Sequence, residues 1–397
     1  MELATVGERY RVNSIDILRG LVMVIMALDH VRDFFHNQAF ISNPTDPAST
    51  TPILFFTRWI THYCAPVFVF LAGTSAYLSG LKKSKKQLSG FLLKRGLWLI
   101  LVEVLIITLG LSFNPFYNML FLQVIWAIGI SMVLLGLMIW LPFKVILVIG
   151  LVIVFGHNLL DAAEAARNQQ VGFWWDLLHH GSFAVYPITQ NHVVAIFYPF
   201  APWTGIMALG YCLGRLYQND IEPAVRSKWL IYMGISTFVV FIFIRLMNVY
   251  GDPSPWTTQN NSIRTIFSFL NVTKYPPSLS FTCMTLGPAL FFLAFLERIR
   301  NAITGFFATF GRVPFFYYVV HFYLIHTICV IGFFFAGYTI DQAVTPQFPF
   351  VFRPPTFGYD LWVVYILWVV VILLMYPMVR WYNKYKRSHQ QWWLSYL

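Results

Sequence analysis

The stretch from Ile15 to His36, IDILRGLVMVIMALDHVRDFFH, has an apolar body running from Leu18 to Leu28. About 20 mostly apolar residues are enough for a helix to cross the hydrocarbon of a bilayer. We therefore predict that residues 15–36 form the first transmembrane helix. Titratable residues lie at both of its ends: Asp16 and Arg19 near the start, and Asp29, His30, Arg32 and Asp33 near the end.

Arg19 and His30 are predicted to share one face of this helix. At roughly 100° per residue, their separation in sequence leaves them offset by only about 20°, and about 16 Å apart along the axis. Ionisable side chains inside a membrane usually face a cavity and mark a functional site. A second interpretation stays open, in which Arg19 reaches the lipid head groups and His30 bonds to a neighbouring helix.

The composition indicates a protein with many membrane spans. Of the 397 residues, 58% are hydrophobic and only 11% are charged, whereas soluble domains carry about 25% charged residues. The formal net charge of +11 does not point to nucleic acid, because the basic residues fall in the loops between apolar runs. We expect an integral membrane protein that binds no nucleic acid.

The fold class is predicted to be all-α, with about ten transmembrane helices in a single domain over residues 1–397. The core bundle covers about 15–382, followed by a tail at 383–397. The basic stretch 82–95 is expected in the cytoplasm, which places both termini there too. The ten expected helices lie near residues 15–36, 54–80, 96–113, 121–141, 143–159, 196–217, 229–250, 277–297, 313–337 and 359–382.

The loops expected on the external side are long and rich in Asn, Thr, Pro, Trp and His; they cover residues 37–53, 160–195, 251–276 and 338–358. Polar loops with aromatic residues suit a hydrophilic ligand such as a sugar, although ordinary surface loops have a similar composition. We expect the segment 171–195 to lie along the membrane interface.

Two further helices contribute histidines. Pro66 is expected to bend the second helix and free backbone carbonyls near His62. On the ninth helix, His321 and His326 are about 140° apart around the axis, so they cannot both face one metal ion. The sequence also lacks an HExxH motif and a Cys/His cluster, and we expect no metal site.

Two long motifs carry a resemblance to a known family. RVNSIDILRGLVMVIMALDHVRDFF (11–35) and APVFVFLAGTSAYLSG (65–80) resemble the catalytic domain of heparan-α-glucosaminide N-acetyltransferase and its bacterial relatives. KYPPSLSFTCMTLGP (274–288) and GRVPFFYYVVHFYLIH (311–326) are similar to the bacterial branch. The spacing of Arg19 and His30 is also similar to that of the envelope O-acyltransferases.

The resemblance implies an acyltransferase that moves an acetyl or other acyl group from cytoplasmic acyl-CoA to an amine or hydroxyl of an external sugar. The expected site residues are His30 and Asp29 for catalysis, Arg19, Lys94 and Arg95 for acetyl-CoA, and Asp33, His62 and His321 for the acceptor. In the lysosomal enzyme the catalytic histidine lies beyond the first helix, so His36 and His62 stay open as alternative bases.

The residue chemistry agrees with that implication. A neutral imidazole can accept the proton that an amine or hydroxyl loses as it attacks a thioester. A carboxylate such as Asp29 or Asp33 could orient the ring, and a basic cluster that includes Arg19 suits CoA phosphates. The sequence leaves open whether transfer is direct or passes through an acyl-histidine.

The sequence also allows two other functions. A secondary transporter of a small polar solute could bind protons or an ion at Asp16, Asp29, His30 or Asp33, but such transporters often contain inverted repeats, and none is visible here. A structural or assembly protein would have neither activity. We expect the chain in the bacterial cytoplasmic (inner) membrane, where the sequence also allows a homodimer.

Overall fold

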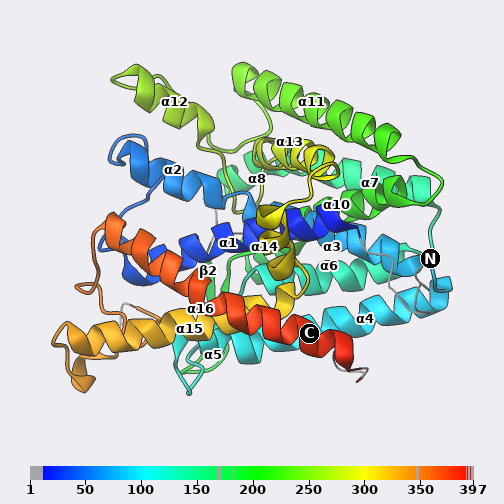
Figure 1. Cartoon of the computed structure of the whole chain (residues 1–397). Helices are drawn as coiled ribbons and strands as arrows, with labels where there is room; N and C mark the ends of the chain where they lie inside the picture. The colour runs from blue at the N-terminus through cyan, green and yellow to red at the C-terminus, as the bar shows by residue number, and fades with distance from the viewer. Residues whose placement is uncertain are drawn as a thin grey trace.

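The computed structural model describes residues 12–167, 171–181, 183–345, 348–389, 391 and 394. It is mostly helical, and its long helices run side by side in one bundle (Figure 1). The long helices are α1 (Asn13–Phe35), α3 (Cys64–Gly80), α4 (Lys85–Val102), α6 (Val124–Met138), α7 (Phe143–Gly156), α10 (Phe200–Leu213), α11 (Pro223–Met247), α13 (Leu279–Leu296), α15 (Pro314–Phe335) and α16 (Leu361–Ser388).

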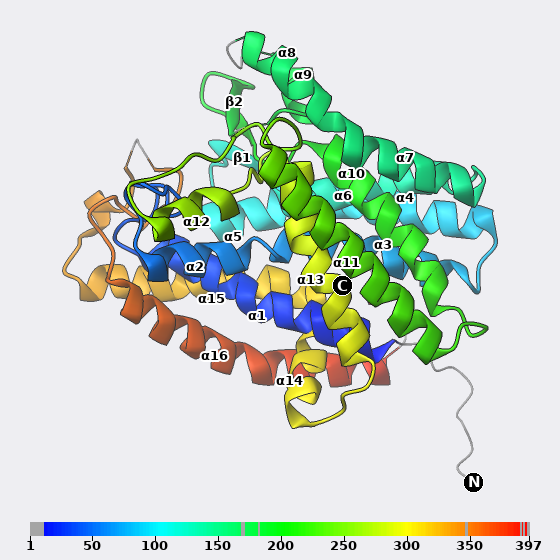
Figure 2. The ribbon, with the colours of Figure 1, turned by 90° about the horizontal axis from the view of Figure 1, so that it is seen from above.

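Shorter elements connect and cover these helices. They are α2 (Pro52–Thr61), α5 (Thr108–Ser112), α8 (Asp161–Ala166), α9 (Phe173–Leu178), α12 (Ser262–Leu270) and α14 (Ala302–Gly311), the π-helical turn η1 (Glu103–Ile107), and the 3₁₀ turns η2 (His157–Leu160), η3 (Gly214–Tyr217) and η4 (Ile340–Gln342). The strands are β1 (Met119–Leu122), β2 (Ala184–Pro187) and β3 (Val193–Ile196). The start of α1 and the end of α16 lie at the same end of the bundle (Figure 2).

Six helical segments in the described part of the chain are long and apolar enough to cross a membrane, and they support an integral membrane protein. They are Pro52–Gly80, Phe143–Ala166, Pro223–Met247, Leu279–Leu296, Pro314–Phe335 and Leu361–Ser388. Helix α1 has 23 residues, or about 35 Å, but its charged ends keep it out of this group. The expected count of ten spans stays a prediction.

Helix α1 lies in the middle of the bundle, in contact with α2, α3, α13, α14, α15 and α16 (Figures 1 and 2). Seventeen of its 23 residues are buried. Its contact with α14 is very close, because Gly20 and Gly311 bring the two backbones together: a β-carbon at Gly311 would lie 1.8 Å from the Asp16 carbonyl oxygen. Small residues allow this approach between helices in membranes.

We expect Gly311→Ala to lower the free energy of unfolding by about 1–3 kcal/mol, since the added methyl group forces α14 away from α1. Gly305→Ala is the matched control on the same helix, because a β-carbon there has nothing within 4 Å; it should be neutral or stabilising by about 0.5–1 kcal/mol. Denaturant unfolding in detergent measures both. Equal stability of the two variants would contradict the close α1–α14 contact.

The expected second helix, 54–80, is broken. Helix α2 ends at Thr61 and α3 begins at Cys64, so the chain turns at residues 62–63. Pro66 is the third residue of α3, within the first turn, where a missing backbone N–H does no harm. Proline therefore does not bend a continuous helix here; it favours the start of a new one. Residues on both sides of the break, from α2 and from α3, line one cavity.

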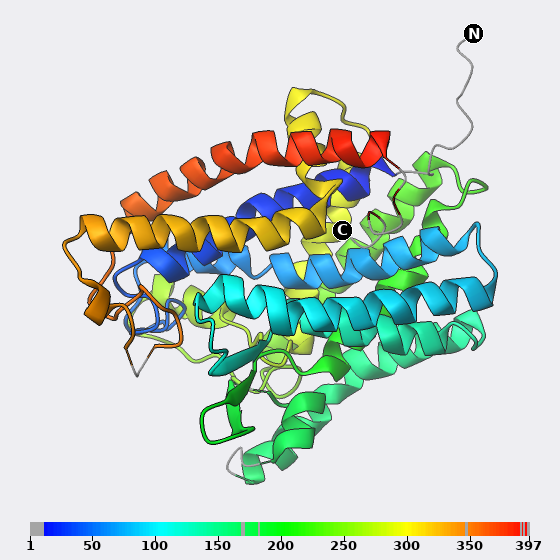
Figure 3. The same cartoon turned by 90° about the horizontal axis from the view of Figure 1, so that it is seen from below.

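The prediction of an all-α fold is incomplete, because three short strands form a sheet in the order β1-β3-β2. Strand β1 pairs in parallel with β3, and β2 pairs antiparallel with β3. The segment 171–195, expected along the membrane interface, supplies α9, β2 and part of β3. This sheet and α9 lie at one end of the bundle, beside the end of α7 (Figure 3).

A buried carboxylate explains why α6 begins at Val124 rather than near residue 121. Glu103, at the start of η1, is 0% exposed. Its two oxygens accept backbone N–H groups from Gln123 at 3.3 Å and Trp126 at 3.1 Å. The N–H groups of a helix's first turn have no partner within the helix, and a negative charge stabilises them. Glu103 therefore fixes Gln123 at the junction of β1 and α6.

Candidate functional site

A cavity of about 820 Å³ lies where α1 ends. Its wall comes from segments far apart in sequence: the last turns of α1, the loop after it, both sides of the α2–α3 break, strands β1 and β3, the turn before α13, and α15. The polar and titratable residues of the wall are Asp29, His30, Arg32, Asp33, Ser42, Asn43, Thr45, Arg58, Thr61, His62, Gln123, Tyr198, Ser254, Asn271, Thr273, Lys274, Tyr275 and Tyr318.

His30 lies on this wall, on the last third of α1. Its imidazole packs against the Phe322 ring, with the centroids 4.5 Å apart, and against the His321 ring at 5.2 Å. Both neighbours come from α15. The side chain is partly exposed toward the cavity. A ring held in this way can meet a molecule in the cavity with one of its nitrogens.

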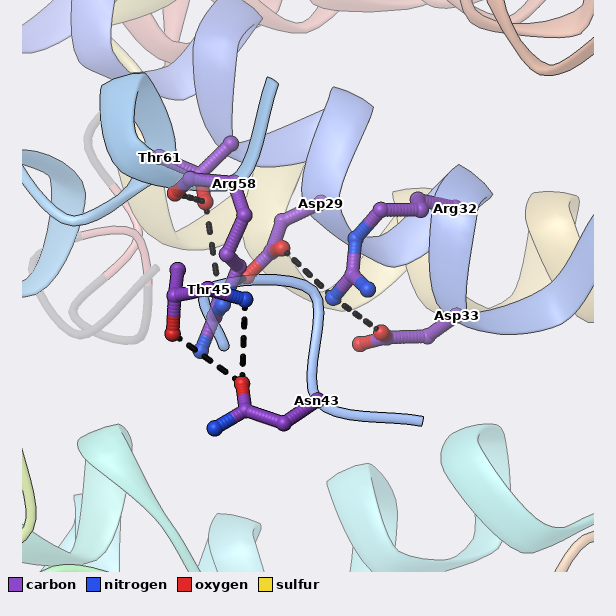
Figure 4. A network of polar contacts seen from close by, with 7 residues as sticks. All are labelled: Asp29, Arg32, Asp33, Asn43, Thr45, Arg58 and Thr61. Carbon is purple, nitrogen blue, oxygen red and sulfur yellow. Dashed lines mark hydrogen bonds and ion pairs between the residues drawn. The ribbon is translucent and has the colours of Figure 1, made fainter. Parts of the chain in front are cut away.

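Asp29 is the centre of an ion network (Figure 4). One carboxylate oxygen accepts a hydrogen bond from Arg58 of α2, and the other accepts one from Arg32 Nη2 at 3.1 Å. Arg32 Nη2 also donates to Asp33 at 2.7 Å. In this structure Asp29 therefore contacts arginines, and it joins α1 to α2 beside His30.

The turn before α13 brings a lysine into the same cavity. Lys274 is 9% exposed, and its ammonium lies 5.0 Å from the Tyr275 ring centroid and 5.8 Å from that of Tyr198. The Tyr198 and Tyr275 rings also contact each other, with their centroids 5.2 Å apart. No ion pair joins Lys274 to a carboxylate among the described residues. Its ammonium group lies against two aromatic rings on the wall of the cavity.

Asp252 fixes the turn that carries Lys274. Its carboxylate accepts the Thr273 backbone N–H at 3.0 Å and the hydroxyl groups of Thr273 and Ser278, both at 2.8 Å. Burial raises the pKa of Asp252. Because the residues on both sides of Lys274 are bonded to one carboxylate, the lysine stem leaves the backbone in a fixed direction.

The other residues predicted for the acceptor lie on or beside this cavity. Asp33 lies on the wall with 28% of its side chain exposed. His62, in the α2–α3 break, is 4% exposed, and its Nδ1 has no hydrogen-bond partner. His321 lies directly behind His30. Aromatic rings complete the wall, from Phe34, Phe40, Phe68, Phe121, Phe183, Phe197, Phe348 and Phe350.

The residues predicted to bind acetyl-CoA are not among those that line the cavity. Arg19, on the first turns of α1, donates to the Ser75 hydroxyl at 2.7 Å, to the Gly311 carbonyl at 3.3 Å, and to Asp16 at 3.3 Å. Lys94, exposed, and Arg95, partly buried, lie on α4. Met26 and Phe68 line the cavity on the side that leads along α1 and α3 toward Arg19.

His36, the remaining alternative base, and His326 of α15 lie elsewhere. His36 follows α1 and forms a β-bridge with Tyr359, while its carbonyl accepts Arg353 Nη2 at 2.9 Å. His326 is stacked on Phe113 at 3.8 Å, and its ring nitrogens contact backbone carbonyls. In the described structure His36 and His326 do not line the cavity, whereas His30 and His62 do.

Sequence reasoning missed three groups in this site: Arg58, Lys274 and the pair Tyr198–Tyr275. None of these residues is among the site residues expected from the sequence. A signal existed for Arg58, which is a single cation in the apolar stretch PILFFTRWIT (52–61). Such a residue needs a partner inside the protein, and Asp29 is that partner. Nothing in the sequence brings Lys274 next to Tyr198.

A second polar cluster holds the outer helices in place. Glu164 accepts from His179 Nδ1 at 2.6 Å, and His179 Nε2 is 3.0 Å from His157 Nδ1. Asp176 contacts His180 and Tyr186. These contacts join α9 and the residues after it to η2 and α8, which follow α7, and to strand β2.

One comparison with known proteins identifies a family. A family model described as heparan-alpha-glucosaminide N-acetyltransferase, catalytic, matches residues 11–246, more than half of the chain. The match includes α1, α2 and α3, with Arg19, Asp29, His30 and His62. The segments that carry Lys274 and His321 lie beyond it. No curated protein matches the sequence.

Proposed function

The chain belongs to the heparan-α-glucosaminide N-acetyltransferase catalytic-domain family, and we propose that it transfers an acetyl group from acyl-CoA to an amine or hydroxyl of a sugar on the opposite side of the membrane. The family indicates a transmembrane N-acetyltransferase and does not favour a transporter. The observation that carries the proposal is the position of His30, on the wall of a large cavity lined by polar and aromatic side chains.

In the proposed reaction His30 is the general base. The acceptor nitrogen or oxygen attacks the thioester carbonyl and loses its proton to the imidazole. A C–N or C–O bond forms, the C–S bond breaks, and the proton passes on to the CoA thiolate. An imidazole suits both transfers because its ordinary pKa is near 6.5. The same ring could carry the acyl group if transfer occurs in two steps.

Acyl-CoA is proposed to enter from the end of the bundle where Arg19 lies. Arg19 is about 16 Å from His30 along the axis of α1, of the order of an extended pantetheine arm. Lys94 and Arg95, on α4, would add positive charge for the CoA phosphates. Met26 and Phe68 lie on the way from the cavity toward Arg19. A flexible methionine side chain can move aside for an incoming acyl chain.

The acceptor is proposed to bind in the cavity, opposite the entry of acyl-CoA. A sugar presents many hydroxyl groups, and the wall offers carboxylate, amide, hydroxyl and ammonium partners for them. Such sites combine an apolar lining with a few well-placed polar groups. The basic stretch 82–95 supports an orientation with both termini in the cytoplasm. We propose that the chain has this orientation in a bacterial inner membrane, with the cavity on the external side.

We expect Lys274→Met to raise the KM for the acceptor about tenfold, since a hydrogen bond to a charged group contributes about 1.5–3 kcal/mol. The methionine keeps the length of the buried stem, so kcat and the KM for acetyl-CoA should change little. Lys228→Met is the control, on an exposed position of α11. Acceptor saturation curves at fixed acetyl-CoA give the answer. An unchanged acceptor KM would remove Lys274 from the acceptor site.

The proposal as a whole is tested on detergent-purified protein. We expect saturable binding of acetyl-CoA by calorimetry, and formation of an acetylated product from glucosamine and related sugars by mass spectrometry. Solute uptake into proteoliposomes without acetyl-CoA binding would instead identify a transporter. The absence of both acetyl transfer and solute uptake would indicate a structural or assembly role.

A further inference from the structure

His321 of α15 combines complete burial with an unused nitrogen. The residue is 0% exposed. Its Nδ1 contacts the backbone carbonyls of Tyr317 at 3.1 Å and Tyr318 at 2.5 Å, within its own helix. Its Nε2 has no hydrogen-bond partner. An unpaired polar atom in a protein interior costs about 1–3 kcal/mol, so its presence beside the cavity calls for an explanation.

The two carbonyl contacts determine which nitrogen carries the proton. A carbonyl oxygen can only accept a hydrogen bond, so Nδ1 must be the N–H donor. In the neutral imidazole, Nε2 is then a lone pair and can only accept. The backbone of α15 thus fixes the tautomer of His321, and its buried Nε2 is a hydrogen-bond acceptor.

The nearest titratable ring is that of His30. The two imidazole centroids are 5.2 Å apart, with an angle of 51° between the planes. At this separation a side-chain rotation brings the edges of two imidazoles within hydrogen-bond distance. Phe322 contacts both rings, at 4.5 Å from His30 and 4.4 Å from His321, and so limits the other orientations that either ring can adopt.

We propose that His321 is a positioning residue for His30: its Nε2 accepts a hydrogen bond from one N–H of the His30 ring, leaving the other His30 nitrogen for the acceptor. This inference rests on the proposed function. As His30 takes the acceptor proton it becomes an imidazolium with two N–H groups. His321 Nε2 accepts a hydrogen bond from one of these N–H groups. The other, newly formed N–H gives its proton to the CoA thiolate. A carboxylate has this role in hydrolase triads, but here Asp29 is bonded to Arg58 and Arg32.

A pair of substitutions separates this role from simple packing. His321→Asn retains a donor near the position of Nδ1 and removes the acceptor at Nε2. His321→Gln places an amide oxygen near Nε2 and loses the bond to Tyr318. We expect His321→Asn to lower kcat about 100-fold with both KM values within about twofold, since acid–base steps contribute about 10²–10⁴. His321→Gln should recover at least about tenfold of that loss.

The result that overturns the proposal is equal activity of the two variants, or a loss confined to KM, in a preparation where the unmodified protein is active. No activity in the unmodified protein would instead refute the proposed function. If His321→Asn does not fold, ¹⁵N-histidine NMR of the unmodified protein decides. We expect a His321 Nε2 signal of an unprotonated nitrogen that shifts in His30→Ala; a protonated Nε2, or no shift, would contradict the inference.

Discussion

Replacing His30 by alanine is expected to abolish acetyl transfer, with a loss of at least about 10³-fold in kcat. In the proposed reaction no other group on the cavity wall takes the proton of the acceptor as it attacks. His30 is bound by ring contacts with Phe322 and His321 rather than by an ion pair, so its removal should leave the bundle folded. Binding of acetyl-CoA should change little, because Arg19 lies at the other end of α1.

The measurement is initial-rate transfer by purified variants, with melting curves and acetyl-CoA calorimetry on the same samples. His192→Ala is the matched histidine control, in the turn between β2 and β3, where the ring contacts Thr189 and the Phe116 carbonyl; its activity should equal that of the unmodified protein. Full turnover by His30→Ala would move the base elsewhere, and His62, the other cavity histidine, would be replaced next.

Asp29→Asn is expected to produce the largest loss of stability in the site, about 3 kcal/mol in the free energy of unfolding. The carboxylate holds two arginines, and the side chains of Asp29, Arg58 and Arg32 are only 12%, 14% and 7% exposed. Removing one partner of a buried ion pair costs about 3–5 kcal/mol, because the other charge stays buried without compensation. Because the three side chains are partly exposed, we expect a loss of stability at the lower end of that range.

Denaturant unfolding of Asp29→Asn, Arg58→Gln and the double variant tests this expectation. If the two charges compensate each other, the double variant loses less stability than the two single losses added together. Asp341→Asn, on the exposed turn η4, is the control and should change stability by less than about 0.5 kcal/mol. A value for Asp29→Asn as small as that of the control would show that the ion network does not stabilise the fold.

The positions of most long helices were predictable, because the thickness of a bilayer sets the length of the apolar segments that cross it. The ten expected ranges fall on helical segments. The boundaries were less predictable. Helix α6 starts at Val124 because the Glu103 carboxylate binds its first backbone N–H groups, and this long-range contact leaves no periodic pattern in the sequence.

The site was predictable where one helix supplies it. The run DHVRD (29–33) placed Asp29, His30 and Asp33 together, and the structure has all three on the cavity wall. The partners of those residues depend on how distant segments pack. Arg58 comes from α2 and Lys274 from the turn before α13, and a single sequence does not show that these segments meet at the end of α1. The same limit applies to His321, whose contact with His30 joins α15 to α1.

In the proposed reaction His30 serves the transfer of an acetyl group from one side of the membrane to a sugar on the other. Proteoliposomes with [¹⁴C]acetyl-CoA outside and glucosamine trapped inside measure this directly. We expect labelled acetylated sugar in the lumen with the unmodified protein, and none with His30→Ala. Product that forms only when donor and acceptor share one compartment, or equal product with His30→Ala, would contradict it.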